Sequence, residues 1–493
     1  MNQYRSWLDN SKSIHSVIKE NALRNPNSIA LIEGENKLTY GELDYITDSM
    51  AYDLVYSYGV HENSIVGVYI EKSINYILAC LSILKTGAEY LHLDEDYSQE
   101  TLAHVLGECK TALVLSSKEL ISNLKIQEKA LITDLDSTNN LGICINTHNE
   151  KTAIIGYTSG TTGLPKGVEV SHRACIYSFN KFWEEVDNIQ PRQNFGYITY
   201  LAWDAFSPLI HGATGIIIPT AANSDMELLK RSLVKYKVNH AFFTPSLLEK
   251  FLNSFDLLTA REALKNVNII WVGGEIIKPQ TIEMLFDAHP HVNLFNNYGP
   301  TECFVVSQGA LVESDSERTK EIPAGKILPE LEYILLDENN NDVTESGLGY
   351  LYIKGAALAN GYHKRPDLNK KHFVAIKDKT YYETGDYCQV SEGRTISILA
   401  RNSFILETET ENLPVSFIEQ KILEQKLVNE CIIINTKKEL MIFCIVNERT
   451  REEDIEDVLK VYTPDFKVIF IDETPLKASS QKINYSLLLE QYS

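Results

Sequence analysis

The chain has 493 residues, of which 44% are hydrophobic, and this length is too great for one ordinary hydrophobic core. Its formal net charge of -21 makes nonspecific binding to nucleic acid or anionic lipid unfavourable, because like charges repel. The start of the chain has no apolar core of signal-peptide length, and no later apolar run approaches the length of a membrane helix, so we expect a cytoplasmic protein with neither nucleic-acid nor membrane partners.

Short β-rich runs alternate with amphipathic stretches from the start of the chain. SIALIEG (28–34), SIVGVYI (64–70) and ALVLSS (112–117) have the composition of strands, and the stretches 40–60 and 73–87 between them have helical spacing. Such alternation predicts helices that cover a largely parallel sheet.

The same pattern recurs further along the chain, where each apolar run ends in small or polar residues. These runs are AIIGYTSG (153–160), TGIIIPT (214–220), HAFFTPS (240–246) and NIIWVGGE (268–275). Strand ends of this kind commonly line ligand sites, so we expect the functional residues at these positions.

The character of the chain changes twice in its last third. From about Glu332, β-rich segments separated by turn residues such as Asn339 predict a small β-subdomain. Beyond Arg401, helical and strand patterns return in a tail of roughly ninety residues, a size that can fold alone. We therefore predict an α/β protein. A large N-terminal domain of helices packed on mainly parallel sheets plus a β-subdomain (1–400) precedes a small mobile α+β domain (401–493).

The segment YTSGTTGLPKGV (157–168) is the most informative stretch of the sequence. Its Gly, Ser and Thr residues can turn backbone amides and hydroxyls toward phosphate oxygens, and Lys166 adds a cation. It differs from a Walker loop, because Pro165 precedes the lysine and Gly167 follows it. Taken alone, the segment also fits a flexible surface hairpin.

This segment resembles the signature of the acyl-adenylate-forming superfamily, which includes acyl-CoA synthetases, luciferases and adenylation domains of nonribosomal peptide synthetases. Further segments resemble motifs of the same superfamily in the expected order: NNYGPTE (296–302), GYLYIKGAALANGYHKRP (349–366), YETGD (382–386) and SSQKINY (479–485). These segments follow one another in the expected order across nearly the whole chain. The chain therefore resembles a stand-alone peptide synthetase adenylation domain or an amino acid–carrier protein ligase.

The resemblance implies ATP and Mg²⁺ as cofactors. The residues it implies for nucleotide binding are Thr158, Ser159, Gly160, Thr161, Thr162, Gly163, Lys166, Asn297, Tyr298, Gly299, Asp386 and Arg401. Thr301 and Glu302 would approach the α-phosphate and the metal, with Glu302 as metal ligand, and Lys482 stands in the place of the catalytic lysine. In isolation, Tyr298 also fits a core aromatic residue, Asp386 a turn residue and Lys482 a solvated charge.

Formation of an acyl-adenylate requires a carboxylate oxygen to attack the α-phosphorus of ATP while pyrophosphate leaves in line. Two anions meet in this step, and the nucleophile is already ionised at neutral pH. The site therefore needs cations and amide donors rather than a general base. The resemblance gives Lys482 the position between the substrate carboxylate and the α-phosphate.

The segment AWDAF (202–206) bears on the acid that is activated. Amino-acid-activating members of the family carry an Asp here whose carboxylate receives the substrate ammonium, and Asp204 stands in that place. A buried carboxylate is costly unless a cation completes it, so an amino acid fits better than a fatty or aryl acid. A helix N-cap is the alternative interpretation of Asp204.

Neighbouring motifs extend the expected substrate pocket to mostly apolar positions. The implied lining residues are Asp204, Ala205, Pro208, Phe242, Trp271, Gly273, Asn297, Val305, Val306 and Lys482. This set resembles pockets that take leucine, and a Trp at the floor would shorten the cavity. We therefore predict an apolar aliphatic substrate, leucine or a smaller amino acid.

In the family, the C-terminal domain rotates so that a thiol of a phosphopantetheine arm or CoA can attack the adenylate. The hinge follows a Gly-Arg pair, in which Ala400 replaces the Gly and Arg401 is retained. Ser403 stands at the hinge position, and Glu407 and Thr410 replace a Lys and a Gly further on. The chain ends eleven residues after Lys482, so we expect any carrier protein to be a separate chain.

Three alternatives stay open at this stage. They are an acyl-CoA synthetase, a stand-alone amide ligase that passes the adenylate directly to an amine, and a noncatalytic relative. Asp204 argues against the first, and the joint presence of Lys166, Glu302, Asp386 and Lys482 argues against the last.

Overall fold

The structure is a computed structural model. It describes residues 11–126, 128–138, 141–158, 165–184, 193–199, 204–317, 322–401, 405–407, 412–425, 428–435, 439–446, 451–463, 465–475 and 485–492. The chain divides into two compact units. The first comprises Met1–Glu332, Ile353–Tyr382 and Ala478–Gln481, and the second comprises Tyr333–Tyr352, Glu383–Lys477 and Lys482–Ser493. The predicted domain boundary between residues 400 and 401 stays a prediction.

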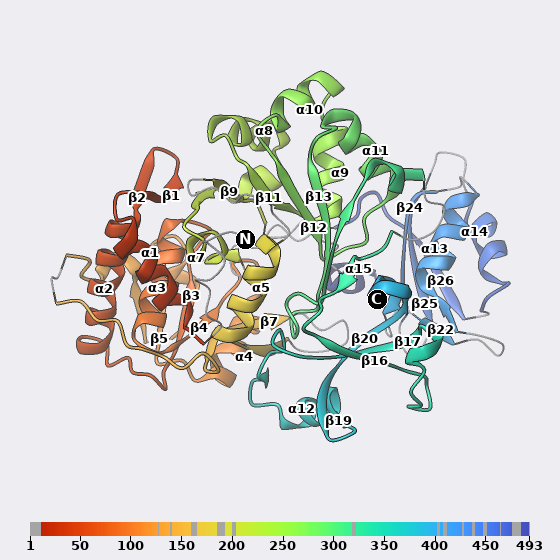
Figure 1. The fold of residues 1–493 in the computed structure, drawn as a ribbon. Helices are drawn as coiled ribbons and strands as arrows, with labels where there is room; N and C mark the ends of the chain where they lie inside the picture. Colours follow the sequence, from red (N-terminus) through yellow and green to blue (C-terminus); the bar gives the residue numbers. More distant parts are fainter. Residues whose placement is uncertain are drawn as a thin grey trace. The chain divides into compact units, whose positions relative to one another are not determined.

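The first unit contains a nine-stranded sheet with the order β15-β14-β13-β12-β11-β9-β10-β1-β2 (Figure 1). Its strands are β1 (Ile29–Glu33), β2 (Asn36–Thr39), β9 (Asn194–Tyr197), β10 (Thr214–Ile217), β11 (His240–Phe243), β12 (Ile269–Gly273), β13 (Asn293–Tyr298), β14 (Ser307–Leu311) and β15 (Lys326–Ile327). The pairs from β1 through β10, β9, β11 and β12 to β13 are parallel, as the alternating pattern predicts. The outer pairs are antiparallel.

One face of this sheet packs on helices, and together they form a hydrophobic core. The helices are α8 (Met226–Lys235), α9 (Pro245–Asn253), α10 (Leu257–Leu264) and α11 (Pro279–Ala288), drawn in green in Figure 1. α8 begins after Asp225, whose carboxylate accepts a hydrogen bond from the Leu228 N–H (3.0 Å). Leu229 and Leu233 are four residues apart and fully buried, so they share the face of α8 that packs on the core.

The opposite face of the sheet carries an aromatic layer covered by α5 (His172–Glu184). The Phe182 ring of α5 lies 6.2 Å from the Phe242 ring of β11 and 6.1 Å from the Trp271 ring of β12, centroid to centroid. Phe242 and Trp271 are register partners in a parallel pair, so their side chains leave the sheet on the same side. Two of the predicted pocket residues therefore share this aromatic layer.

The first unit also contains a seven-stranded sheet with the order β18-β8-β7-β4-β3-β5-β6. Its strands are β3 (Ile65–Tyr69), β4 (Glu89–His92), β5 (Leu113–Ser116), β6 (Lys129–Leu131), β7 (Thr152–Thr158), β8 (Lys166–Ser171) and β18 (Gly361–Tyr362). The strands from β6 to β7 are parallel, whereas β8 and β18 join antiparallel.

The remaining helices of the first unit are α1 (Ile14–Arg24), α2 (Tyr40–Tyr56), α3 (Ile74–Lys85), α4 (Gln99–Cys109), α7 (Ser207–Ile210) and α12 (Pro366–His372). α3 is buried along almost its whole length. Its Lys85 ammonium lies 2.7 Å from Asp44 Oδ1 and 2.6 Å from Asp48 Oδ1, both on α2. These carboxylates provide the partners that a buried ammonium requires, and they fix α2 against α3.

A smaller five-stranded sheet has the order β16-β17-β20-β19, with β21 paired to β20. Its strands are β16 (Glu332–Leu336), β17 (Leu348–Lys354), β19 (Phe373–Ile376), β20 (Lys379–Val390) and β21 (Ile396–Arg401). This sheet confirms the predicted β-rich subdomain, and the sheets together confirm the predicted α/β class.

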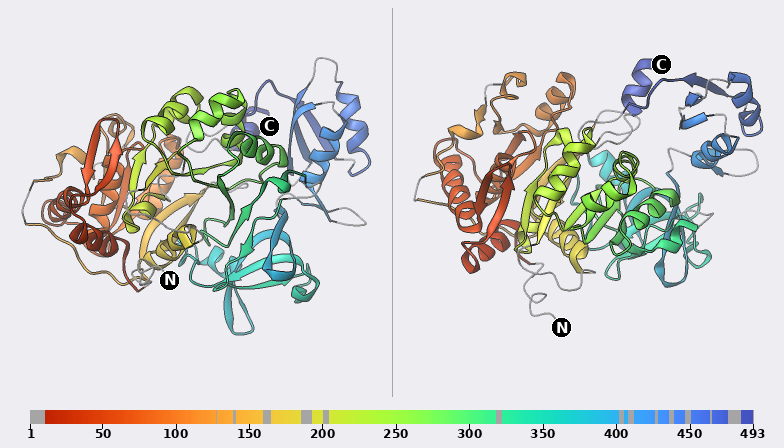
Figure 2. Two further views of the ribbon diagram at one scale, coloured as in Figure 1. Left: turned by 45° about the horizontal axis from the view of Figure 1, so that its top comes forward. Right: turned by 90° about the horizontal axis from the view of Figure 1, so that it is seen from above.

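The end of the chain forms an α+β arrangement, drawn in blue in Figure 2. Its elements are β22 (Ile405–Glu407), β23 (Asn412–Pro414), α13 (Val415–Glu424), β24 (Val428–Asn435), β25 (Leu440–Val446), α14 (Glu452–Leu459), β26 (Phe466–Phe470) and α15 (Tyr485–Tyr492). Ile418 and Ile422 of α13 and Ile455 of α14 pack against one face of the three-stranded sheet β24-β25-β26. No helix within the described ranges is both long enough and apolar enough to cross a membrane.

Candidate functional site

The predicted phosphate loop connects two antiparallel strands. β7 ends at Thr158 and β8 begins at Lys166, and these two residues are register partners in the ladder. A Walker loop leads from a strand into a helix, whereas this loop connects two strands, so it is a different structural motif. The predicted loop residues Ser159, Gly160, Thr161, Thr162 and Gly163 lie outside the described residues.

Lys166, Glu302 and Tyr362 meet at one point of the first unit. The Lys166 ammonium donates a hydrogen bond to the Tyr362 hydroxyl (2.9 Å), which donates to Glu302 Oε1 (2.6 Å). Lys166 Nζ lies 3.4 Å from the same carboxylate oxygen and 4.4 Å from the centroid of the Tyr362 ring. Glu302 is 6% exposed and Tyr362 is 2% exposed, so the phenol and the carboxylate are largely shielded from water. The Lys166 side chain is half-buried.

Backbone pairing brings these three side chains together. Tyr362 of β18 is the register partner of Val168, two residues beyond Lys166 on β8. The Ala359 N–H donates to the Glu302 carbonyl (2.8 Å), which ties the segment before β18 to the turn that carries the carboxylate. The cluster therefore depends on three chain segments that only the tertiary fold makes neighbours.

Burial raises the pKa of the Tyr362 phenol well above its ordinary value, and the Glu302 carboxylate raises it further. The phenol is thus a neutral donor at physiological pH. Its hydroxyl also lies 3.3 Å from the Tyr382 hydroxyl.

The turn that carries Thr301 and Glu302 begins where β13 ends, at Tyr298. A Cβ atom on Gly299 would lie 2.1 Å from the Phe304 carbonyl oxygen, so this turn excludes any side chain at that position. The Val306 N–H donates to the Tyr298 carbonyl (2.8 Å) and closes the turn.

Two buried polar groups of the predicted nucleotide site lack partners within the described part of the chain. They are the Thr158 hydroxyl and both polar atoms of the Asn297 amide. Buried polar atoms are normally hydrogen-bonded, so such groups are suited to a polar ligand. Together with the Lys166 cation and the Glu302 carboxylate, they fit a nucleotide phosphate and a divalent metal ion.

Asp386 and Arg401 belong to the second unit and are register partners in the β20-β21 ladder. Asp386 is 1% exposed, and its N–H donates to Thr384 Oγ1 (3.1 Å). The structure therefore brings the two backbones together. The Arg401 side chain and Lys482 lie outside the described residues, so the roles of all three stay predictions.

Four predicted pocket residues lie on one face of the nine-stranded sheet. Phe242 pairs with Trp271, and Gly273 pairs with Asn297. A Cβ atom on Gly273 would lie 2.7 Å from the Asn297 carbonyl oxygen and 3.1 Å from Phe242 Cζ, so only glycine leaves this space open. Trp271 is 1% exposed.

Ala205, which follows Asp204, is connected to the same aromatic layer through Tyr197. The Tyr197 hydroxyl donates to the Ala205 carbonyl (2.6 Å), and the Tyr197 ring lies 5.4 Å from Phe195, which lies 6.1 Å from Trp271. Of the other predicted lining residues, Pro208 is buried in α7, and Val305 and Val306 are buried just after the turn that carries Glu302.

Asp204 is half-buried, and no hydrogen bond or ion pair joins it to another of the residues described. Burial raises the pKa of its carboxyl from 3.8 to about 7. An uncompensated carboxylate of this kind is suited to a cationic ligand.

Comparison with known proteins decides the family. The model of the family described as AMP-binding enzyme matches residues 18–363, which is more than half of the chain. The chain belongs to the AMP-binding enzymes. It is thus a member of the acyl-adenylate-forming superfamily, as the motifs implied, and members of this family use ATP.

Zwittermicin A synthase ZmaJ of Bacillus cereus is 26% identical to this AMP-binding enzyme over 97% of the chain and 95% of ZmaJ. Glycine betaine reductase ATRR of Emericella nidulans is 25% identical over 90% of the chain, but the chain spans 36% of the length of ATRR. The structure of Klebsiella oxytoca NpsA in complex with 3-hydroxyanthranilyl-AMSN has a TM-score of 0.81 at 20% identity. The match covers 98% of this chain and all of NpsA, which supports the fold.

Sequence reasoning missed Tyr362 as a residue of the AMP-binding enzyme's site. This tyrosine lies inside the segment 349–366, which resembles a family motif, but the motif does not indicate its partners. The partner Lys166 is 196 residues away in sequence, and no local pattern predicts that contact.

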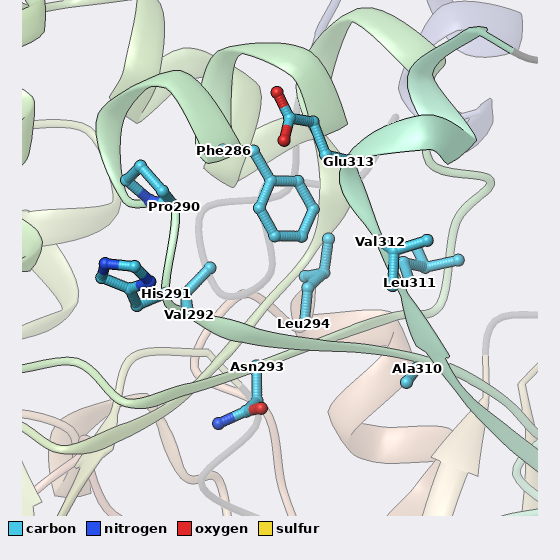
Figure 3. Close-up of a pocket in the computed structure, with 10 residues that line it drawn as sticks. All are labelled: Phe286, Pro290, His291, Val292, Asn293, Leu294, Ala310, Leu311, Val312 and Glu313. Atoms are coloured by element: carbon cyan, nitrogen blue, oxygen red, sulfur yellow. The ribbon is translucent and has the colours of Figure 1, made fainter.

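A separate cavity of the enzyme, of about 350 Å³, is lined by Phe286 of α11, by the start of β13 and by the end of β14 (Figure 3). Its β13 residues Asn293 and Leu294 are at the amino end of the strand, whereas Asn297 and Tyr298 are at the carboxyl end. None of the predicted site residues lines this cavity. We therefore assign it no part in nucleotide or substrate binding.

Asp204→Asn is expected to stabilise the free enzyme more at pH 8 than at pH 5. The folded carboxyl has a raised pKa, so the folded state binds more protons than the unfolded state, and stability falls as pH rises from about 4 to about 7. Asparagine removes this loss. We expect the gain in melting temperature to be larger by roughly 2–5 °C at pH 8.

Asp256→Asn is the control for this pH series. A hydrogen bond from the Thr259 N–H holds the pKa of the Asp256 carboxyl below 3.8, so that this group is ionised at both pH values. Its substitution should change the melting temperature equally at pH 5 and pH 8. An equal change for Asp204→Asn at the two pH values would contradict the raised pKa of Asp204.

Proposed function

We propose that this enzyme activates an apolar aliphatic amino acid, leucine or a smaller one, as an aminoacyl-adenylate. We further propose that it passes the aminoacyl group to the phosphopantetheine thiol of a separate carrier protein. The observation that carries the proposal is the Asp204 carboxylate, which burial holds near a pKa of about 7 and which has no cation beside it in the described part of the chain. The ammonium of an amino acid would complete this charge, and a fatty or aryl acid would leave it unpaired.

In the first half-reaction, an oxygen of the amino acid carboxylate forms a bond to the α-phosphorus of ATP. The bond from that phosphorus to the bridging oxygen of pyrophosphate breaks, and the products are aminoacyl-AMP and pyrophosphate. Lys166 and the Thr158 hydroxyl would hold phosphate oxygens, Thr301 would approach the α-phosphate, and Lys482 would bridge the two reacting anions. Magnesium, when bound, neutralises phosphate charge, and Glu302 would hold it.

The substrate side chain would lie against the aromatic layer. Phe242, Trp271 and Gly273 carry no charge, so a charged substrate side chain would lose its hydration without gaining a partner there. One methylene in an apolar pocket changes binding by only about 1–3 kcal/mol, so we expect relaxed choice among aliphatic amino acids.

A stand-alone amide ligase is the second candidate, and one observation favours it. Glu407 and Thr410 replace the Lys and Gly that the family carries near the thiol acceptor. An acidic residue in this place offers no cation to an incoming phosphopantetheine arm, whereas direct attack by an amine on the adenylate does not need one.

Trapping of the adenylate with hydroxylamine tests the proposal. The enzyme would be incubated with ATP, Mg²⁺ and single amino, fatty or aryl acids in the absence of CoA, and hydroxamates and AMP would be measured by mass spectrometry. We expect equal amounts of AMP and hydroxamate with aliphatic amino acids. Hydroxamates from fatty or aryl acids, with none from amino acids, would contradict the Asp204 argument.

A further inference from the structure

We propose that Tyr362 is a positioning residue that keeps the Lys166 ammonium and the Glu302 carboxylate apart, so that each is available to Mg-ATP. This inference rests on the proposed function, in which these two groups hold phosphate and metal. The phenol is the one neutral group in the cluster, and it contacts both charges.

The distances among the three side chains indicate that the Tyr362 hydroxyl separates Lys166 from Glu302. A direct hydrogen bond between an ammonium and a carboxylate has a length of about 2.7–2.9 Å. Lys166 Nζ and Glu302 Oε1 are 3.4 Å apart, whereas both contacts through the Tyr362 hydroxyl are of normal length, 2.9 Å and 2.6 Å. The hydroxyl thus occupies the position where a closed ion pair would form.

A closed ion pair would compete with the ligand. In a largely buried site, an ammonium and a carboxylate attract each other strongly, and each must be released before it can bind phosphate or metal. With the phenol between them, Lys166 donates one hydrogen bond within the described part of the chain, to Tyr362, so two of its three N–H donors are left for other acceptors. Glu302 likewise keeps Oε2 free of the contacts made by Oε1.

The surrounding structure holds the Tyr362 ring in one place. The Asn369 side chain accepts a hydrogen bond from the Tyr362 N–H (2.6 Å) and donates one to the Tyr362 carbonyl (3.0 Å). A Cβ atom on Gly361, whose φ is +139°, would lie 2.7 Å from this Asn369 oxygen, so the clamp requires glycine there. The rings of His372 and Phe373 pack against the tyrosine ring, each with a centroid separation of 5.9 Å.

Tyr362→Phe tests the proposal because it removes the hydroxyl and keeps the ring. Tyr382→Phe is the matched control, since it removes a neighbouring buried hydroxyl whose contact to Tyr362 is longer, at 3.3 Å. The readout is the dissociation constant of ATP, measured by calorimetry with Mg²⁺ and with EDTA, together with the melting temperature of the free protein. None of these readouts depends on turnover.

We expect Tyr362→Phe to weaken Mg-ATP binding by about 10- to 100-fold, the range for loss of a hydrogen bond to a charged group. We expect metal-free ATP to be affected less, because the Glu302 carboxylate acts on the metal. Tyr382→Phe should stay within about threefold of the wild type. A purely structural role would lower the melting temperature and leave the ratio of the two dissociation constants unchanged.

A wild-type protein that does not bind Mg-ATP refutes the proposed function itself. Wild-type binding with an unchanged Tyr362→Phe variant, or equal losses in both tyrosine variants, overturns the role of Tyr362. If Tyr362→Phe does not fold, Asn369→Ala loosens the clamp while retaining the phenol. A loss of Mg-ATP affinity smaller than 10-fold but above threefold would then support the inference, and no loss would overturn it.

Discussion

Replacement of Lys482 by alanine is expected to lower amino-acid-dependent exchange of pyrophosphate into ATP by about 10²- to 10³-fold, the effect of removing one charge-stabilising group from a transition state. The step brings a carboxylate and a triphosphate together, and a cation between them is needed most where their charges meet. Binding of ATP alone should be nearly unchanged, because Lys166 and the phosphate loop would still be present. Exchange kinetics and calorimetric ATP binding on one preparation measure both effects.

Lys477→Ala is the control for this substitution. Lys477 precedes Lys482 by five residues in the same segment but lies outside the motif SSQKINY. Its removal changes the net charge of the protein by the same amount and should leave exchange intact. Full exchange by the Lys482→Ala protein would refute the assigned role, and equal loss in both variants would point to a general effect on the segment.

Asp204→Asn should raise KM for leucine by about 10²-fold or more, the scale of leaving one member of a buried charge pair without its partner. The asparagine has nearly the same shape, so the change isolates the negative charge. Asp204→Asn should not lower the activity toward 4-methylpentanoate, which is leucine without its amine. Steady-state kinetics with the two acids measures this difference directly.

The matched control is Asp225→Asn, which alters an exposed helix cap on α8. It should change KM for leucine by less than about twofold, because surface substitutions away from a site have small effects. If both variants raise KM equally, or if Asp204→Asn impairs leucine and 4-methylpentanoate to the same extent, Asp204 does not recognise the substrate ammonium.

Much of the fold could be predicted because its signals are local. The apolar runs at 240–246 and 268–275 contain the neighbouring parallel strands β11 and β12, and the stretches 40–60 and 73–87, predicted from their spacing, contain the helices α2 and α3. The order of the motifs predicts that Lys166 and Glu302 share one site, and in the fold their charged atoms lie 3.4 Å apart.

The sequence patterns could not predict which distant segments pair with one another. A two-residue strand, Gly361–Tyr362, pairs with β8, and nothing in its length or composition indicates that partner. The side chains that pack against Trp271 could not be predicted for the same reason. Its lateral neighbours His240, Phe182 and Trp183 come from another strand and from α5, and one-dimensional periodicity gives only the face on which it lies.

Exchange of labelled pyrophosphate into ATP, with leucine and 4-methylpentanoate compared at equal concentration and without CoA, tests the central claim most directly. The assay reports the adenylation step alone, and the two acids differ only in the amine. The proposed function predicts strong exchange with leucine and little with 4-methylpentanoate. Equal exchange with both acids, or exchange with 4-methylpentanoate alone, would contradict amino acid activation through Asp204.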